Sequence, residues 1–162
     1  MNPKFADFQK KITNPIQFTF FKLVKLPAAF FAGLKIGKLD AQEAVVQVKH
    51  GWINQNPFQS MYFAVQSMAA EMSTGLFAVG QTYQRNPPVS MLVVNIEGSF
   101  FKKATGLISF TCTDGALVDD TIEACIATGE GRTLQCTSIG TNEQGEKVSS
   151  FIITWSFKAK KL

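Results

Sequence analysis

The segment from Met61 to Gln81 constrains the fold most, because it is long, apolar and almost free of charge. Between Lys49 and Arg85 the only charged residue is Glu71, near the middle of the segment. The segment is nearly long enough to span a membrane, but a carboxylate at that depth is costly in lipid and no second apolar helix is available to pair with it. We therefore expect a helix buried inside a water-soluble domain, wrapped by the rest of the chain.

Most of the remaining chain has the β-branched or alternating patterns typical of strands. The expected strands cover residues 43–49, 90–101, 107–113, 132–140 and 147–157. We expect two hairpins, one joining the second and third of these strands and one joining the last two through a polar turn. In the last strand, apolar residues at every second position from Phe151 to Phe157 predict a half-exposed antiparallel sheet.

Helices are predicted at two further places. Residues 116–127 place Leu117, Ile122 and Ile126 at helical spacing before Gly129, which predicts a short amphipathic helix.

The N-terminal residues 3–33 are rich in Phe and Lys and are punctuated by Pro15 and Pro27, so we expect two short helices there. Their apolar side chains are expected to pack on the sheet or across a subunit boundary; they are Phe8, Ile12, Phe18, Phe21 and Leu26. The alternative is that this Lys- and Phe-rich stretch binds a membrane surface.

Charge, cysteines and motifs exclude several classes of function. The 16 basic residues exceed the 12 acidic ones by only 4 and are spread along the chain, which does not favour nucleic acid as a partner. Three unpaired cysteines and a single histidine, His50, do not predict a metal site. No phosphate-loop, dinucleotide, serine-hydrolase or metalloprotease motif occurs. The N-terminus lacks the pattern of a signal peptide, so we expect a cytoplasmic protein with reduced thiols.

This order of elements predicts an α+β architecture in which an antiparallel sheet wraps around one long helix. The resemblance to a known family becomes specific in four segments, which are Leu39-Asp40, NQNPFQSMYF (54–63), AAE (69–71) and GEGR (129–132). They resemble the hotdog-fold, thioesterase-like proteins of the DUF4442 type, which are related in pattern to the PaaI-like acyl-CoA thioesterases. The resemblance covers Leu34 to Lys158. It implies a hotdog domain over 34–162, an N-terminal helical extension over 1–33, and a homodimer or a dimer of dimers.

The resemblance also implies a chemistry, the hydrolysis of an acyl-CoA or related acyl thioester. The amino end of the central helix would polarise the thioester carbonyl, Glu71 would act as general base or nucleophile, and Asn56 would orient the attacking water. Substrate-binding residues would be Asn54, Phe58, Ser60, Met61 and Tyr62. No metal and no cofactor beyond the coenzyme A of the substrate is expected.

Alternatives remain for the function and for each site residue. Ser60-Met61-Tyr62 stand where relatives place a His-Gly-Gly sequence, which favours a non-catalytic module that binds an acyl thioester or serves as a dimeric scaffold. Asn56 could instead cap the turn before the helix, and Glu71 could make a structural hydrogen bond. Lys102 and Lys103 could contact coenzyme A phosphates or could be solvated turn residues.

Overall fold

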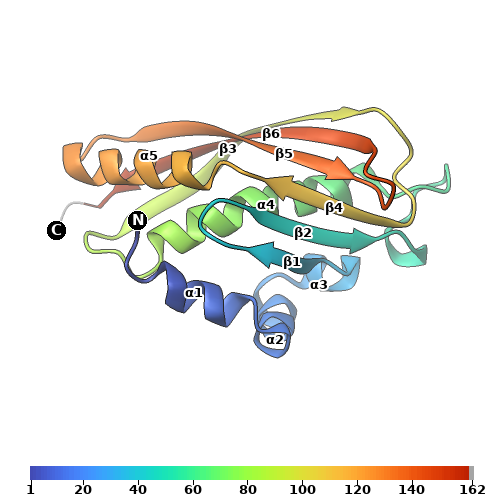
Figure 1. Cartoon of the computed structure of the whole chain (residues 1–162), viewed down its shortest axis with the longest axis horizontal. Helices are drawn as coiled ribbons and strands as arrows, with labels where there is room; N and C mark the ends of the chain where they lie inside the picture. The colour runs from blue at the N-terminus through green and yellow to red at the C-terminus, as the bar shows by residue number, and fades with distance from the viewer. Residues whose placement is uncertain (161–162) are drawn as a thin grey trace.

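Helix α4 (Phe63–Thr82) is the axis around which the other elements are arranged in the computed structural model, which describes residues 1–160 (Figure 1). The sheet curves over one side of α4, and the N-terminal helices lie on its opposite side (Figure 1). The remaining elements are α1 (Phe5–Ile12), α2 (Pro15–Lys25), α3 (Pro27–Ala32), β1 (Lys35–Leu39), β2 (Ala44–Lys49), the 3₁₀ helix η1 (Trp52–Asn54), β3 (Val89–Phe100), β4 (Leu107–Cys112), α5 (Gly115–Thr128), β5 (Arg132–Thr141) and β6 (Lys147–Ala159). The predicted α+β architecture is confirmed. The last two residues of the range 34–162 lie outside the described part of the chain.

The six strands form one antiparallel sheet in the order β1-β2-β4-β5-β6-β3. The predicted hairpin of β5 and β6 is present, but the predicted hairpin of β3 and β4 is wrong. Strand β4 pairs with β2 and β5, so both of its edges are occupied, and β3 pairs with the free edge of β6. Short connections favour hairpins in general, but here long-range pairing with the thirteen-residue β6 overrides the local turn. Strand β1, which the sequence analysis missed, is a short Lys- and Gly-containing strand at the other edge.

Helix α4 is buried on most of its surface, and two of its polar side chains are paired with the sheet. The hydroxyl of Ser73 donates a hydrogen bond to Ser138 of β5 at 2.8 Å, and Trp155 Nε1 of β6 donates one to Thr74 Oγ1 at 2.9 Å. Both bonds are buried, where an unpaired polar group would be costly. Among residues 1–160, no helix has the length and hydropathy needed to cross a bilayer.

The N-terminal region contains three helices, one more than predicted. Pro15 and Pro27 each occupy the first turn of a helix, where proline is compatible with helical geometry, so they start α2 and α3 as well as separating them. Helices α1 and α3 pack against α4, and α2 packs on α1 and α3. Their apolar side chains face a cavity lined by α4 together with Met91 and Trp155 of the sheet, and packing across a subunit boundary stays a prediction. The approach of α1 depends on Gly80 of α4, because a Cβ atom there would lie 2.6 Å from the Phe5 ring.

Helix α5 has the predicted position and packs Ile122 and Ile126 against the core as predicted, but not Leu117. Val118, Ile122 and Cys125 are fully buried, whereas Leu117, predicted to face the core, is 52% exposed.

We expect Thr74→Val to destabilise the protein by about 1–3 kcal/mol, because the variant leaves the buried Trp155 indole N–H without an acceptor. Urea unfolding followed by circular dichroism measures this difference. Thr133→Val, on the exposed side of β5, is the matched control and should change stability by less than about 0.5 kcal/mol. Equal stability of the two variants would show that the Thr74–Trp155 bond contributes nothing.

Candidate functional site

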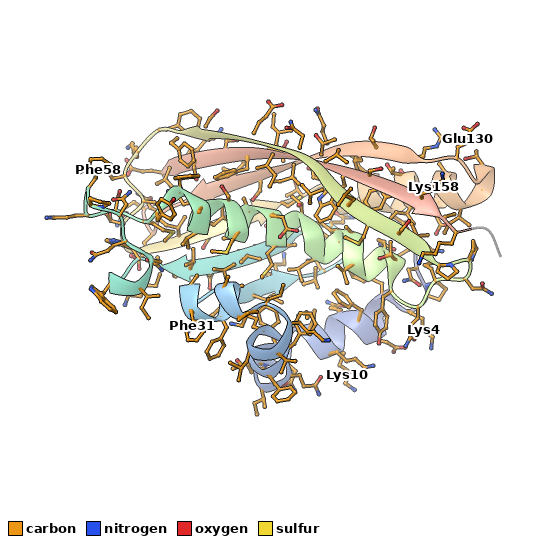
Figure 2. The ribbon with its side chains drawn as sticks, turned by 180° about the vertical axis from the view of Figure 1, so that it is seen from behind. Lys4, Lys10, Phe31, Phe58, Glu130 and Lys158 are labelled. Atoms are coloured by element: carbon orange, nitrogen blue, oxygen red, sulfur yellow. The ribbon has the colours of Figure 1, made fainter. Side chains whose placement is uncertain are left out.

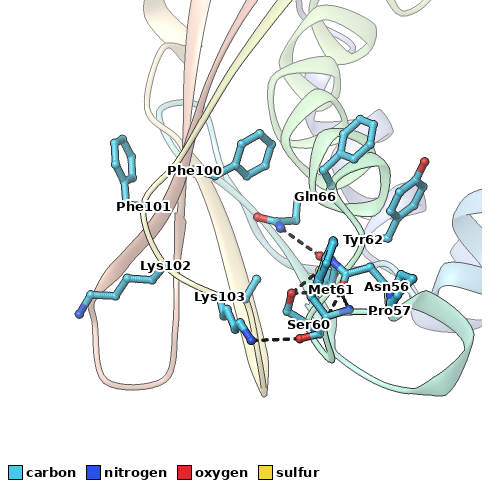
Figure 3. A pocket seen from close by; sticks show the side chains of 13 residues that line it. Asn56, Pro57, Ser60, Met61, Tyr62, Gln66, Phe100, Phe101, Lys102 and Lys103 are labelled. Atoms are coloured by element: carbon cyan, nitrogen blue, oxygen red, sulfur yellow. Dashed lines mark hydrogen bonds between the residues drawn. The ribbon is translucent and has the colours of Figure 1, made fainter.

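Two cavities lie along α4, one at its amino end and one near its middle. The first, which we call the loop cavity, has a volume of about 630 Å³ and lies between the loop before α4 and the end of β3 (Figure 3). The second, the Glu71 cavity, has a volume of about 250 Å³ and lies between α4, the N-terminal helices and the sheet. Between them, these cavities contain most of the predicted site residues.

The loop before α4 is organised by the side chain of Asn56. Its Oδ1 accepts hydrogen bonds from the backbone N–H groups of Phe58 and Ser60 at 3.0 and 3.2 Å, and its Nδ2 donates to Ser60 Oγ at 3.2 Å (Figure 3). This is the turn-forming use of an asparagine side chain. Gln59 in the same loop has a φ of 59°, a left-handed conformation that glycine adopts more readily. Asn56 therefore lines the loop cavity with its carboxamide engaged in holding the loop.

The amino end of α4 has free hydrogen-bonding groups and borders the loop cavity through Phe63. Tyr62, at the N-cap position, makes no side-chain cap, and within residues 1–160 the N–H groups of Phe63 and Ala64 have no acceptor. The first turn of α4 contains no acidic residue. These N–H groups, together with the helix dipole, can stabilise negative charge that develops on an oxygen atom.

Gln66, one turn into α4, is a lining residue that the sequence analysis did not select. Its Nε2 donates to the Met61 carbonyl at 3.3 Å, while its buried Oε1 has no hydrogen-bond partner among the described residues (Figure 3). A buried acceptor without a partner can bind a ligand or a water molecule. The available sequence signal was a lone amide side chain at the start of an otherwise apolar helix.

The other predicted substrate-binding residues divide between the cavity and the scaffold. Phe58, Ser60, Met61 and Tyr62 all line the loop cavity. Asn54 does not, because its side chain joins Gly51, Lys49 and Ala32 through hydrogen bonds.

Lys102 and Lys103 also line the loop cavity, next to Phe100 and Phe101 at the end of β3 (Figure 3). Lys102 pairs with the exposed Glu146, and Lys103 Nζ donates to the Phe58 carbonyl at 3.1 Å. Their positive charges therefore lie beside an otherwise mostly apolar cavity, as binding of an anionic group would require.

The Glu71 cavity is apolar apart from the carboxylate itself. All five apolar residues selected in the N-terminal region line it, namely Phe8, Ile12, Phe18, Phe21 and Leu26. The opposite wall comes from α4, β3 and β6, including Gly75, Met91 and Trp155. A Cβ at Gly75 would lie 3.3 Å from Glu71 Oε1 and 3.4 Å from the Trp155 ring, so the glycine leaves space next to the carboxylate.

Glu71 has no hydrogen bond or ion pair to its carboxylate among residues 1–160. Burial in the apolar cavity raises the pKa of Glu71 above its ordinary value, because it disfavours the charged form. A partly buried carboxyl group with a raised pKa is typical of groups that transfer protons at an active site.

Glu71 and Asn56 do not meet within one chain. Glu71 lies eight residues after Phe63, which corresponds to about 12 Å along the helix axis. The amino end of α4 and the carboxylate therefore border separate cavities of the same molecule. One chain alone cannot apply both groups to a single carbonyl carbon.

The three cysteines, which are the remaining candidates for chemistry, are part of the buried core. Cys112, Cys125 and Cys136 are free and buried, and a hydrogen bond to Cys112 together with burial raises the pKa of the Cys136 thiol. Among residues 1–160, no group of three or more His, Cys, Asp or Glu side chains is arranged to hold a metal ion.

We expect Glu71→Gln to be more stable than the wild type at pH 8, with a smaller difference at pH 4. Between the ordinary pKa of 4.5 and the raised pKa of Glu71, the folded state binds more protons than the unfolded state, so the wild type loses stability as pH rises. Glutamine does not titrate and removes this loss. Thermal unfolding of both proteins across this pH range measures the difference, and Glu130→Gln, which alters a 77% exposed side chain, is the control. A difference that shrinks as pH rises would contradict the assigned environment of Glu71.

Comparison with known proteins identifies a family model and solved structures that match this chain. The model of a family described as a domain of unknown function, DUF4442, matches residues 17–157. No curated protein matches the chain in sequence.

Solved structures match nearly the whole chain at low sequence identity. A Pseudomonas aeruginosa protein of unknown function, described as a probable thioesterase, has a TM-score of 0.75 and 17% identity, covering 93% of this chain and 99% of that one. A Chlorobaculum tepidum protein of unknown function has a TM-score of 0.75 and 16% identity with the same coverage. A thioesterase of Haemophilus influenzae has a TM-score of 0.63 and 12% identity, covering 86% of this chain and 88% of that one. The predicted hotdog fold is confirmed.

Proposed function

This chain belongs to the DUF4442 family, and from that premise we propose that it hydrolyses an acyl thioester such as an acyl-CoA. The observation that carries the proposal is the carboxylate of Glu71, which is unpaired within the described chain and lies in an apolar cavity. Burying a carboxylate without a hydrogen-bond or ion-pair partner is unfavourable, so its presence in the cavity supports a functional role. An apolar cavity next to a proton acceptor suits an acyl chain whose carbonyl is attacked by water.

The complete site is proposed to form between two copies of the chain. Strand β3 is at the edge of the sheet, and within residues 1–160 no strand pairs with its outer side. Its Met91 end borders the Glu71 cavity and its Phe100 end borders the loop cavity. Antiparallel pairing of β3 with β3 of a second copy would therefore place the loop cavity of one subunit beside the Glu71 cavity of the other.

In the proposed reaction, the thioester carbonyl oxygen accepts hydrogen bonds from the Phe63 and Ala64 N–H groups of one subunit. Glu71 of the partner subunit takes a proton from water as the water oxygen bonds to the carbonyl carbon. The carbon–sulfur bond then breaks, and the proton passes from Glu71 to the leaving thiolate. Gln66 Oε1 would accept a hydrogen bond from the attacking water, and Lys102 and Lys103 would contact the phosphates of coenzyme A.

Glu71→Gln is expected to lower kcat for the best acyl-CoA substrate by roughly 10²–10⁴-fold, because the amide cannot accept the proton. A panel of acyl-CoA esters of graded chain length, assayed by release of free thiol, identifies that substrate. The wild-type rate should increase with pH as the Glu71 carboxyl loses its proton, with the acidic limb above the ordinary glutamate pKa. Undiminished hydrolysis by Glu71→Gln would rule out its role as base.

Mixed dimers test whether two subunits share one site. Gln66→Met should lower turnover at least about tenfold by removing an acceptor for the attacking water. Co-refolding equal amounts of Gln66→Met and Glu71→Gln should restore about one quarter of wild-type activity, because half of the dimers are mixed and each has one intact site. If the mixture is only as active as its components, the shared site is wrong.

The dimer itself has a direct test. Leu92 and Ile96 are 65% and 43% exposed on β3, and Leu92→Lys/Ile96→Lys would place charges along the proposed interface. We expect the wild type to sediment as a dimer or larger assembly and the double variant to sediment as a monomer. Leu117→Lys on α5 is the control and should leave the mass unchanged. A monomeric wild type would contradict the proposal.

A non-catalytic acyl thioester-binding module is the second candidate function. It is favoured by the Asn56 carboxamide, which is engaged in the loop, and by the absence of glycine at Gln59, where φ is 59°. Binding of an acyl-CoA by the wild type without hydrolysis of any ester in the panel would support this function in place of the first.

A further inference from the structure

Helix α2 is apolar on two opposite faces, and residues 1–160 cover only one of them. Phe18 faces inward and is 6% exposed. Ile16, Phe20, Leu23 and Val24 follow the i, i+4, i+7, i+8 spacing of a single helical stripe and are between 49% and 80% exposed. An outward stripe of four large apolar side chains is unfavourable in water and indicates a surface that is covered in use.

The exposed stripe continues onto the neighbouring helix. Phe21 at the side of α2 is 42% exposed, and Phe31 of α3 is 62% exposed. Helix α2 is the element farthest from the sheet in both views, and Lys10 and Phe31 lie on the same side of the molecule (Figures 1 and 2). We call this surface the α2–α3 face and define it by Ile16, Phe20, Phe21, Leu23, Val24 and Phe31.

The basic residues are spread along the chain, but their excess over acidic residues lies in the same part of the chain as this face. Residues 1–33, which include the three N-terminal helices, contain five lysines and one aspartate, a net charge of +4, whereas the whole chain also has a net charge of +4 and residues 34–162 are therefore neutral overall. Within residues 1–160, no carboxylate forms an ion pair with Lys10, Lys25 or Lys35. Lys22 differs, because its Nζ turns inward to the Leu34 carbonyl.

We propose that the α2–α3 face docks on the surface of an anionic phospholipid bilayer. A helix with a large apolar face and nearby lysines lies in the plane of the interface, with its apolar side chains below the headgroups and its cations among the phosphates. The excess of positive charge in the N-terminal region favours an anionic partner and orients the molecule toward it. The face exposes aromatic and aliphatic side chains, which suits a fluid lipid surface.

Docking would also bring the Glu71 cavity close to the bilayer. Phe21 and Leu26 line that cavity and are 42% and 40% exposed, so its wall is continuous with the α2–α3 face. This consequence for a long-chain acyl substrate rests on the proposed function, whereas the docking itself does not.

Co-sedimentation with vesicles tests the proposal without any substrate. The wild type should sediment with vesicles of phosphatidylcholine and phosphatidylglycerol, bind less to phosphatidylcholine alone, and lose binding as salt screens the lysines. Phe20→Ser/Val24→Ser should weaken binding at least about tenfold, since both side chains would lose their burial in lipid. Lys10→Gln and Lys25→Gln should each weaken binding to the anionic vesicles by about fivefold.

Two matched controls separate docking from folding and from catalysis. Leu117→Ser replaces a side chain that is 52% exposed on α5 and should bind vesicles as the wild type does. Glu71→Gln should also bind as the wild type does, so loss of hydrolysis and loss of docking are independent results. The proposal is overturned if the wild type does not sediment with the anionic vesicles, or if Phe20→Ser/Val24→Ser binds them equally well. It is also overturned if that double variant changes the mass of the protein in solution, because a protein surface then covers the face.

Discussion

Burial of the apolar helix α4 is the constraint on which the rest of the structure depends. A twenty-residue helix that is apolar on nearly every side cannot be covered by a flat sheet alone. The sheet curves over one side, and the N-terminal helices cover much of the other. Two pairs of polar groups join the helix to the sheet inside this arrangement, Thr74 with Trp155 and Ser73 with Ser138. Among residues 1–160, the Glu71 carboxylate and Gln66 Oε1 have no such partner, and both line the candidate cavities.

Helix α4 also keeps apart the two groups that the proposed reaction needs. Its free N–H groups lie at its amino end, and its carboxylate lies about 12 Å farther along the axis. A helix is too rigid to bring these groups together. In the proposed dimer, each subunit therefore contributes its loop cavity to one site and its Glu71 cavity to the other. Strand β3 borders both cavities at its opposite ends, and this is why edge-to-edge association would complete the proposed site.

The candidate site could be predicted in part. Glu71 was recognisable because a single charge in an apolar helix has to be explained. Phe58, Ser60, Met61 and Tyr62 were implied by the family resemblance of the segment that precedes the helix. Gln66 was not selected, because an amide in a helix carries no charge and its missing partner becomes visible only in the fold. Asn54 and Asn56 were recognised as special, but whether an amide faces a ligand or its own loop depends on backbone geometry.

The sequence by itself determined the buried helix, the strands with clear alternation, and the β5–β6 hairpin, because these depend on periodicity and on contacts between close neighbours in the chain. Only the tertiary structure decided that β3 pairs with β6, that the N-terminal helices pack on α4, and that their apolar residues surround Glu71. Each of these contacts joins residues that are far apart in the sequence. Their formation depends on which surfaces remain uncovered once α4 is wrapped, and no local pattern contains that information.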